Sequence, residues 1–295
     1  MAAGRIFPLL LIPALAGCPR SGSPSPVDGI GPPGSAEAGR GGKGHETGAP
    51  AAFAPTLLAS ANGAELAETF RGWPLIVTAA VRIGDGSPMA LAVPASELGR
   101  AAFVDVEDDA GRSIAWPFAI VNAAGEASGG SGGSGEVAWV LAPEGTSSIE
   151  PGTYRVTVVV EPAALEGVEG KAFSGWKGTV RSRPATVRIG EEPGPLTPAL
   201  RERKVLLEAG YLVLRGDRAG ALARAGEHLA VDPRSVACLT LQGDIHAAEA
   251  RWEEALGAYE RAVEAFEEKH AGTQPPPVLV RKRDAALRNL GSERR

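Results

Sequence analysis

The chain has 295 residues, of which 30 are Lys or Arg and 35 are Asp or Glu, so its formal net charge is −5 at pH 7. Residues 56–195 are the acidic part, with ten basic side chains against seventeen acidic ones, whereas residues 196–295 hold sixteen against fifteen. Because nucleic-acid phosphates need a basic surface, this balance argues against a nucleic-acid-binding protein.

The N-terminus combines one basic residue with a short apolar run. Arg5 is followed by residues 6–14, IFPLLLIPA, which has the layout of a secretory signal peptide. The run is shorter than the roughly 20 apolar residues that span a bilayer. Residues 15–18, LAGC, then place small side chains directly before a cysteine. This junction resembles the lipobox of bacterial lipoproteins, in which the first mature residue is a cysteine that carries a diacylglyceryl group.

The lipobox resemblance implies a signal peptide at residues 1–17 and lipid attachment at Cys18. Each buried methylene contributes about 0.8 kcal/mol and a single chain binds only reversibly, so two or more acyl chains make a durable anchor. Pro19 and Arg20 follow Cys18, without the Asp that retains many enterobacterial lipoproteins at the inner membrane. We therefore expect a protein anchored by lipid in the bacterial cell envelope, at the outer membrane.

Residues 18–55 are rich in Gly, Pro, Ser and Ala and show no apolar periodicity. Such a segment cannot bury enough apolar surface to offset its ordering entropy. We predict a disordered tether, and about 35 residues of it reach on the order of 30–35 Å.

Alternating apolar residues punctuated by Gly and Pro predict strands in the next part of the chain. They fall at residues 75–83, 89–93, 101–106, 114–121, 137–141, 154–160 and 178–189, the last with a break near Pro184. Six to eight short strands at this spacing favour an all-β sandwich over an α/β fold, and we assign it residues 56–192. The segment IEPGTYRV at residues 149–156 resembles a turn and strand of immunoglobulin-like and fibronectin-like domains. The resemblance implies that Tyr154 is structural, with its hydroxyl bonded back to the backbone.

Four tryptophans, Trp73, Trp116, Trp139 and Trp176, lie at or near the predicted strands. The apolar alternation around Trp116 and Trp139 favours positions in the sandwich core. The alternative is that several of these rings share one face and stack on sugars. The Gly/Ser-rich residues 124–136 predict a hairpin tip, either a tolerated insertion or an adaptable recognition loop.

Composition changes near residues 193–195, after which Ala, Leu, Glu and Arg recur at helical spacing. Ala221 and Ala255 occupy equivalent places 34 residues apart, and Gly243 and Ala262 are further small residues around Tyr259. This pattern resembles the tetratricopeptide repeat (TPR).

The TPR resemblance implies two helix pairs, at residues 201–233 and 234–268, and residues 278–290 predict a terminal capping helix. The predicted fold class is therefore multidomain, an all-β immunoglobulin-like sandwich followed by an all-α TPR-like array at residues 196–295.

In TPR proteins the first helix of each pair lines a concave face that binds extended peptides or partner helices. Aligned residue by residue, the partner-binding positions implied here are Arg203, Leu206, Thr240 and Asp244. Because two repeats give a shallow groove, a scaffold or dimerisation role is the alternative to peptide capture.

The sequence contains no nucleophile elbow, P-loop, zinc helix or paired glycosidase motif. His228, His246 and His270 lie beyond helical reach of one another, so we expect no catalytic residue, no metal site and no cofactor. With Cys18 lipidated, Cys238 has no disulfide partner and is expected to be a buried, inert thiol.

These observations together predict a non-enzymatic, lipid-anchored adaptor or scaffold that holds a protein partner at the cell envelope through TPR-like repeats. The alternative is a lipoprotein whose sandwich binds a polysaccharide or another ligand through exposed tryptophans. An envelope hydrolase is a third, weaker hypothesis.

Overall fold

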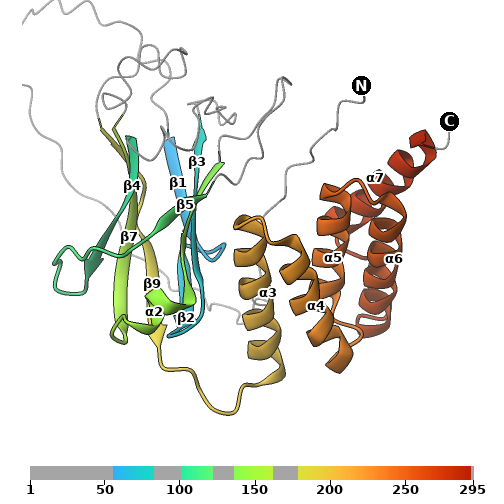
Figure 1. Cartoon of the computed structure of the whole chain (residues 1–295), viewed down its shortest axis with the longest axis horizontal. Coiled ribbons are helices and arrows are strands. Elements are labelled where there is room, and N and C mark those ends of the chain that lie inside the picture. The colour runs from blue at the N-terminus through green and yellow to red at the C-terminus, as the bar shows by residue number, and fades with distance from the viewer. Residues whose placement is uncertain (1–55, 83–100, 122–135, 162–178, 294–295) are drawn as a thin grey trace, which may run out of the picture.

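The computed structural model describes residues 56–82, 101–121, 136–161 and 179–293. Within these ranges a β-sheet region is followed by a helical region, as the sequence predicts (Figure 1). The strands are β1 (Thr56–Ala61), β2 (Leu66–Phe70), β3 (Leu75–Arg82), β4 (Ala102–Asp108), β5 (Ala119–Val121), β6 (Glu136–Leu141), β7 (Gly152–Val160), β8 (Val180–Arg181) and β9 (Ala185–Gly190). The helices are α2 (Pro143–Ser147), α3 (Pro198–Leu214), α4 (Arg218–Val231), α5 (Val236–Ala248), α6 (Trp252–Lys269) and α7 (Pro277–Glu293).

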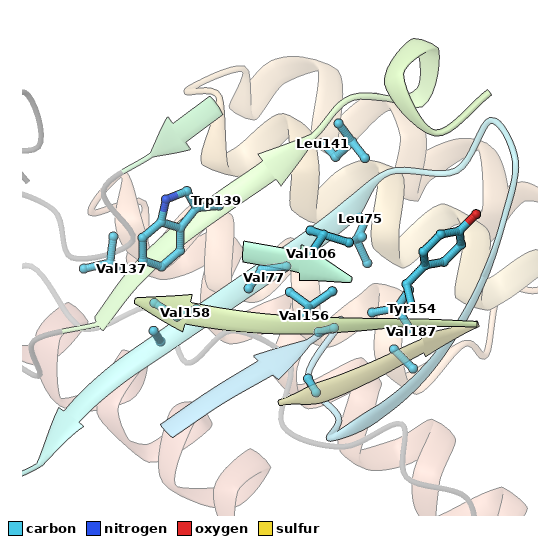
Figure 2. Close-up of a cluster of buried hydrophobic side chains, with 14 of the residues drawn as sticks. Leu75, Val77, Val106, Val137, Trp139, Leu141, Tyr154, Val156, Val158 and Val187 are labelled. Carbon is cyan, nitrogen blue, oxygen red and sulfur yellow. The ribbon is translucent and has the colours of Figure 1, made fainter. Parts of the chain in front are cut away.

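The strands form two sheets that pack face to face around one core. One sheet has the order β1-β3-β6-β5, and the other has the order β2-β9-β7-β4 with β8 beside β7. Strand β2 runs parallel to β9, and the other paired strands are antiparallel. In Figure 2, Val77 and Trp139 of the first sheet face Val106 and Val156 of the second. This arrangement is a β-sandwich.

Strand β7 shows why the sheets face each other. Tyr154, Val156 and Val158 are buried, whereas Arg155 and Thr157 between them are less so. Successive side chains of a strand point to opposite faces, so this alternation turns one face of β7 to the core. Each fully buried valine contributes about 1.5–3 kcal/mol to that packing.

Tyr154 has the structural role that the sequence predicts. Its hydroxyl donates to the backbone carbonyl of Glu150 at 2.6 Å, and its ring meets the Trp116 ring edge-on at 4.9 Å between centroids. Burial raises the pKa of the tyrosine above its ordinary value of 10.0. The hydrogen bond fixes the turn that leads into β7.

The predicted strands at residues 75–83, 101–106, 137–141 and 154–160 correspond to β3, β4, β6 and β7, and the break near Pro184 separates β8 from β9. The strand predicted at 114–121 is reduced to β5, because Pro117 lacks an N–H for a strand ladder. The strand predicted at 89–93 lies outside the described residues. Strands β1 and β2 and the short helix α2 were not predicted.

Each of the first three long helices begins at a side-chain cap. The Thr197 hydroxyl accepts from the Leu200 amide, the Asp217 carboxylate from the Gly220 amide, and the Ser235 hydroxyl from the Cys238 amide. Such caps satisfy amides that have no partner within the first turn.

The turns inside the two helix pairs, α3 with α4 and α5 with α6, repeat the same hydrogen bonds 34 residues apart. Amides 215, 216 and 217 donate to carbonyls 211, 213 and 212, and amides 249, 250 and 251 donate to carbonyls 245, 247 and 246. Gly216 (φ 83°) and Ala250 (φ 57°) occupy the left-handed region at the same point of each turn. The period predicted from Ala221 and Ala255 therefore holds in the backbone, and both alanines are fully buried.

The second pair is closed by a tight contact between Gly243 and Tyr259. A Cβ atom at Gly243 would lie 2.4 Å from Cε1 of the tyrosine, so α5 and α6 approach closely only because this position is glycine. The corresponding residues of the first pair, Ala209 and Ala225, are both fully buried. The terminal helix predicted at residues 278–290 is present as α7, which buries Leu279 against the second pair.

Candidate functional site

The four predicted partner-binding residues lie on the first helix of each pair, Arg203 and Leu206 on α3 and Thr240 and Asp244 on α5. Helices α3 and α5 are in contact, so the structure places the four residues on neighbouring helices. Most of their polar groups already have partners inside the chain.

The two residues on α3 make contacts within the chain. The Arg203 guanidinium donates to the backbone carbonyl of Glu68 on β2, and burial lowers its pKa from the ordinary 12.5. Leu206 is 2% exposed and belongs to the core of the first helix pair. Arg203 thus connects the helices to the sandwich, and Leu206 offers little surface to a partner.

The two residues on α5 differ in their hydrogen bonds: Asp244 binds other helices, whereas Thr240 binds only within α5. Asp244 accepts from the Tyr259 hydroxyl at 2.7 Å and from Lys282 Nζ of α7 at 2.6 Å. Burial raises the pKa of Asp244 above its ordinary 3.8, and the bonds from Lys282 and Tyr259 oppose that rise. The Thr240 hydroxyl donates to the Val236 carbonyl of its own helix at 2.7 Å, and its side chain is half-buried.

A cluster between the sandwich and the helices was missed in the sequence. The Trp73 indole N–H donates to Glu192 Oε2 at 2.7 Å, and Lys204 Nζ of α3 donates to the same oxygen at 2.8 Å. Lys204 Nζ also lies 5.6 Å from the centroid of the fully buried Trp73 ring, within the range of a cation–π interaction. Lys204 and Trp73 lower the pKa of Glu192 from its ordinary 4.5. The acidic pair Glu191-Glu192 before the domain boundary was the available signal.

A second group missed in the sequence combines an imidazole with two carboxylates. Glu202 of α3, His228 of α4 and Asp232 after α4 each place one ligand atom within 4.8 Å of the others. The i, i+4 spacing of His228 in α4 and Asp232 directly after it was the signal. Glu202 comes from another helix, and the sequence does not reveal its approach.

The three described tryptophans of the sandwich lie in or against its core, as favoured by the sequence for Trp116 and Trp139. Trp73 and Trp139 are 0% and 2% exposed, and Trp116 is half-buried against the same core. Trp73 and Trp139 are therefore too deeply buried for a sugar to stack on their rings. Trp176 and residues 124–135 of the predicted hairpin tip lie outside the described residues, and Glu136 begins β6.

The predicted signal peptide, the Cys18 lipid site and the tether all fall in residues 1–55, outside the described ranges. No helix in the described part of the chain has the length and apolar character needed to cross a bilayer. Cys238 is a free cysteine, fully buried as expected, and burial raises the pKa of its thiol to about 11.

No protein-family model matches this chain, and no curated protein matches it. Among solved structures, it is similar to the crystal structure of the Lin-41 filamin domain, with 16% sequence identity over 45% of this chain and 93% of that chain and a TM-score of 0.23. The β-sandwich is established by the strand pairing and the shared core.

Proposed function

We propose that this chain is a bacterial envelope lipoprotein, attached through Cys18, that acts as a non-enzymatic adaptor or scaffold for a protein partner through TPR-like helix pairs. The observation that carries the proposal is the hydrogen-bonded turn repeated 34 residues apart in the two pairs. A helix pair of 34 residues is typical of the TPR, and stacked pairs present extended surfaces to other proteins.

In this proposal the immunoglobulin-like sandwich is the platform on which the helices are mounted. The contacts of Lys204 with Glu192 and of Arg203 with the Glu68 carbonyl support a fixed attachment of α3 to the sandwich. The tether at residues 18–55 holds this unit away from the membrane, and the helices present their surface to proteins of the envelope.

Thr240 is the predicted position with which a partner search should begin. Its side chain is half-buried on α5, and its hydroxyl is bonded within the same helix. Replacing it therefore leaves intact the bonds that join α5 to α6 and α7.

Site-specific photocrosslinking in the native organism tests the adaptor role. A photoreactive amino acid at position 240 of the full chain should yield a discrete protein adduct. The same amino acid at Glu253, an exposed position on α6, is the matched control and should not yield that adduct. Equal adducts at both positions, or none at either, would contradict a partner surface on the first helices.

Metabolic labelling with an alkyne analogue of palmitate tests the anchor. Label should appear on the full chain and should be lost in Cys18→Ser. Because the chain has two cysteines, Cys238→Ser is the matched control and should retain the label. Unlabelled protein, or label that persists without Cys18, would refute lipid attachment at that residue.

A further inference from the structure

The two helix pairs differ in chemical character at three positions related by the 34-residue period. Glu202, His228 and Asp232 in the first pair correspond to Val236, Ala262 and Phe266 in the second. Ala262 is fully buried, and Val236 packs on the core of its pair. The first pair thus places an imidazole and two carboxylates where the second pair places apolar side chains.

The polar group of the first pair contains a nitrogen without a partner. Nε2 of His228 is buried and has no hydrogen-bond partner within the described part of the chain. Buried polar atoms in proteins are almost always bonded, so an orphaned ring nitrogen needs an explanation. One ligand atom from each of the three residues lies within 4.8 Å of the others, and none of the three side chains is fully exposed.

Neighbouring groups hold the two carboxylates in place. The Ser235 hydroxyl donates to Glu202 Oε1, and the Arg234 amide donates to Asp232 Oδ1 at 3.1 Å. Lys269 Nζ lies 3.5 Å from Asp232 Oδ2. Ser235 is fully buried, so its hydrogen bond holds the Glu202 carboxylate against the protein interior. Such outer contacts orient metal-binding carboxylates in known sites.

We propose that Glu202, His228 and Asp232 form a Zn²⁺ site that joins α3 to the end of α4. A neutral imidazole and two carboxylates match the nitrogen and oxygen donors that zinc binds, and the two carboxylates balance its charge. Ligands at about 2.0–2.1 Å in a tetrahedral site lie about 3.4 Å apart, which side-chain rotation reaches from a 4.8 Å spread. Three protein ligands leave the fourth position to water.

The ion would strengthen the pair that lacks the tyrosine contact. Tyr259 links α6 to α5 by packing on Gly243 and bonding Asp244, whereas the first pair has Ala225 at the corresponding position. A metal bridge between α3 and α4 would add to the Arg224–Glu208 ion pair that already joins these helices, and it would stand where the second pair has its tyrosine contact. The earlier expectation of a chain without a metal site is revised by this proposal.

Calorimetric titration of the chelator-treated full chain with ZnCl₂ tests the site. We expect one site in the wild-type chain and a dissociation constant at least tenfold weaker in His228→Ala. Alanine is the residue that the second pair carries at this position, Ala262, so the helix accommodates it. The matched control is His246→Ala, because His246 on α5 also has a buried ring nitrogen, Nδ1, without a partner among the described residues, yet lies outside the cluster. It should leave Zn²⁺ binding unchanged.

Thermal unfolding and cobalt substitution provide the second measurement. Zn²⁺ should raise the melting temperature of the wild-type chain and of His246→Ala, and it should have no such effect on His228→Ala or on the isosteric Glu202→Gln. Co²⁺ should give the intense visible absorption of a tetrahedral site in the wild-type chain alone among the wild type, His228→Ala and Glu202→Gln. Absent binding in the wild type, binding retained in both cluster variants, or equal loss in His246→Ala would overturn the proposal.

Discussion

The two helix pairs share one backbone design and fill it differently. Their turns repeat the same hydrogen bonds at the same spacing, with Gly216 and Ala250 at equivalent points. The second pair then packs Tyr259 against Gly243, while the first has Ala225 and Ala209 there. The turns and small residues therefore set the 34-residue period, while the side chains packed between the two helices differ from one pair to the other.

The two pairs also contact different neighbours through lysine ion pairs, the first pair at the sandwich and the second pair at α7. Lys204 of the first pair binds Glu192 beside the sandwich, with side chains 23% and 35% exposed. Lys282 of α7 binds Asp244 of the second pair, with side chains 19% and 15% exposed. Figure 1 shows the resulting order, with α3 beside the sandwich and α7 at the far end of the helices.

Truncating the aromatic that distinguishes the second pair should have the largest effect. Tyr259→Ala leaves a cavity between α5 and α6 and removes the hydroxyl bonded to Asp244. We expect a loss of about 3–5 kcal/mol in the free energy of unfolding, followed by helical circular dichroism in denaturant. Tyr211→Ala, at a half-buried tyrosine of α3, is the control and should lose far less. Equal losses would mean that Tyr259 does not distinguish the pairs.

Replacing each lysine in turn compares the contact of the first pair with the sandwich and the contact of the second pair with α7. Lys282→Met leaves the Asp244 carboxylate buried with one partner fewer and should destabilise the chain by about 2–4 kcal/mol at pH 7. Since burial raises the pKa of Asp244, acid that protonates the carboxyl should shrink this loss. Lys204→Met breaks a more exposed pair and should lose about 1 kcal/mol or less in the same denaturant titration. The reverse order would show that the sandwich flank is the stronger one.

The equivalent turn positions predict a reciprocal exchange. Ala250→Gly relieves a left-handed alanine and should stabilise the chain by about 0.5–1 kcal/mol, whereas Gly216→Ala should destabilise it by about 1 kcal/mol. Open space surrounds the position where a Cβ would stand at Gly216, so the change reports backbone strain alone. Thermal melts of the two variants should shift in opposite directions. Shifts of the same sign would contradict the equivalence of the turns.

The pH dependence of the sandwich flank should be the smallest effect. Glu192 binds Lys204 and Trp73 as a carboxylate, so folding lowers its pKa below the ordinary 4.5. Its stabilisation is complete above about pH 4.5 and is lost as the pH falls through the lower, folded-state pKa. Because the pair is partly exposed, Glu192→Gln should lower the free energy of unfolding by less than about 1 kcal/mol at pH 7, and the difference from wild type should shrink as the pH falls through the lowered, folded-state pKa. A difference that does not shrink as the pH falls below 4.5 would assign the effect to another contact.

The sequence predicts local features well where one physical rule decides them. The 34-residue period, the buried alanines and the Tyr154 hydrogen bond follow from small residues and turn residues whose meaning is local. Strands β1 and β2 were missed because their short runs, such as LAETF at residues 66–70, lack strong alternation. The strand predicted at residues 114–121 is longer than the observed β5, because Pro117 has no N–H to donate to a strand ladder.

The candidate sites were harder to predict because they depend on approach between distant segments. Alignment with the TPR predicts that Arg203 and Asp244 line a partner-binding groove. In the structure, Arg203 binds β2 and Asp244 binds α7. The grouping of Glu202 with His228 and of Trp73 with Lys204 needs the packing of separate elements, which no local pattern encodes.

The contact of Arg203 with the Glu68 carbonyl has a consequence for solubility. Strand β2 stands at the end of its sheet, and an uncovered strand there is a template on which another chain can add. Arg203 of α3 binds a backbone carbonyl of this edge strand and so disfavours its pairing with a strand of another molecule. A sandwich cut away from its helices should therefore self-associate.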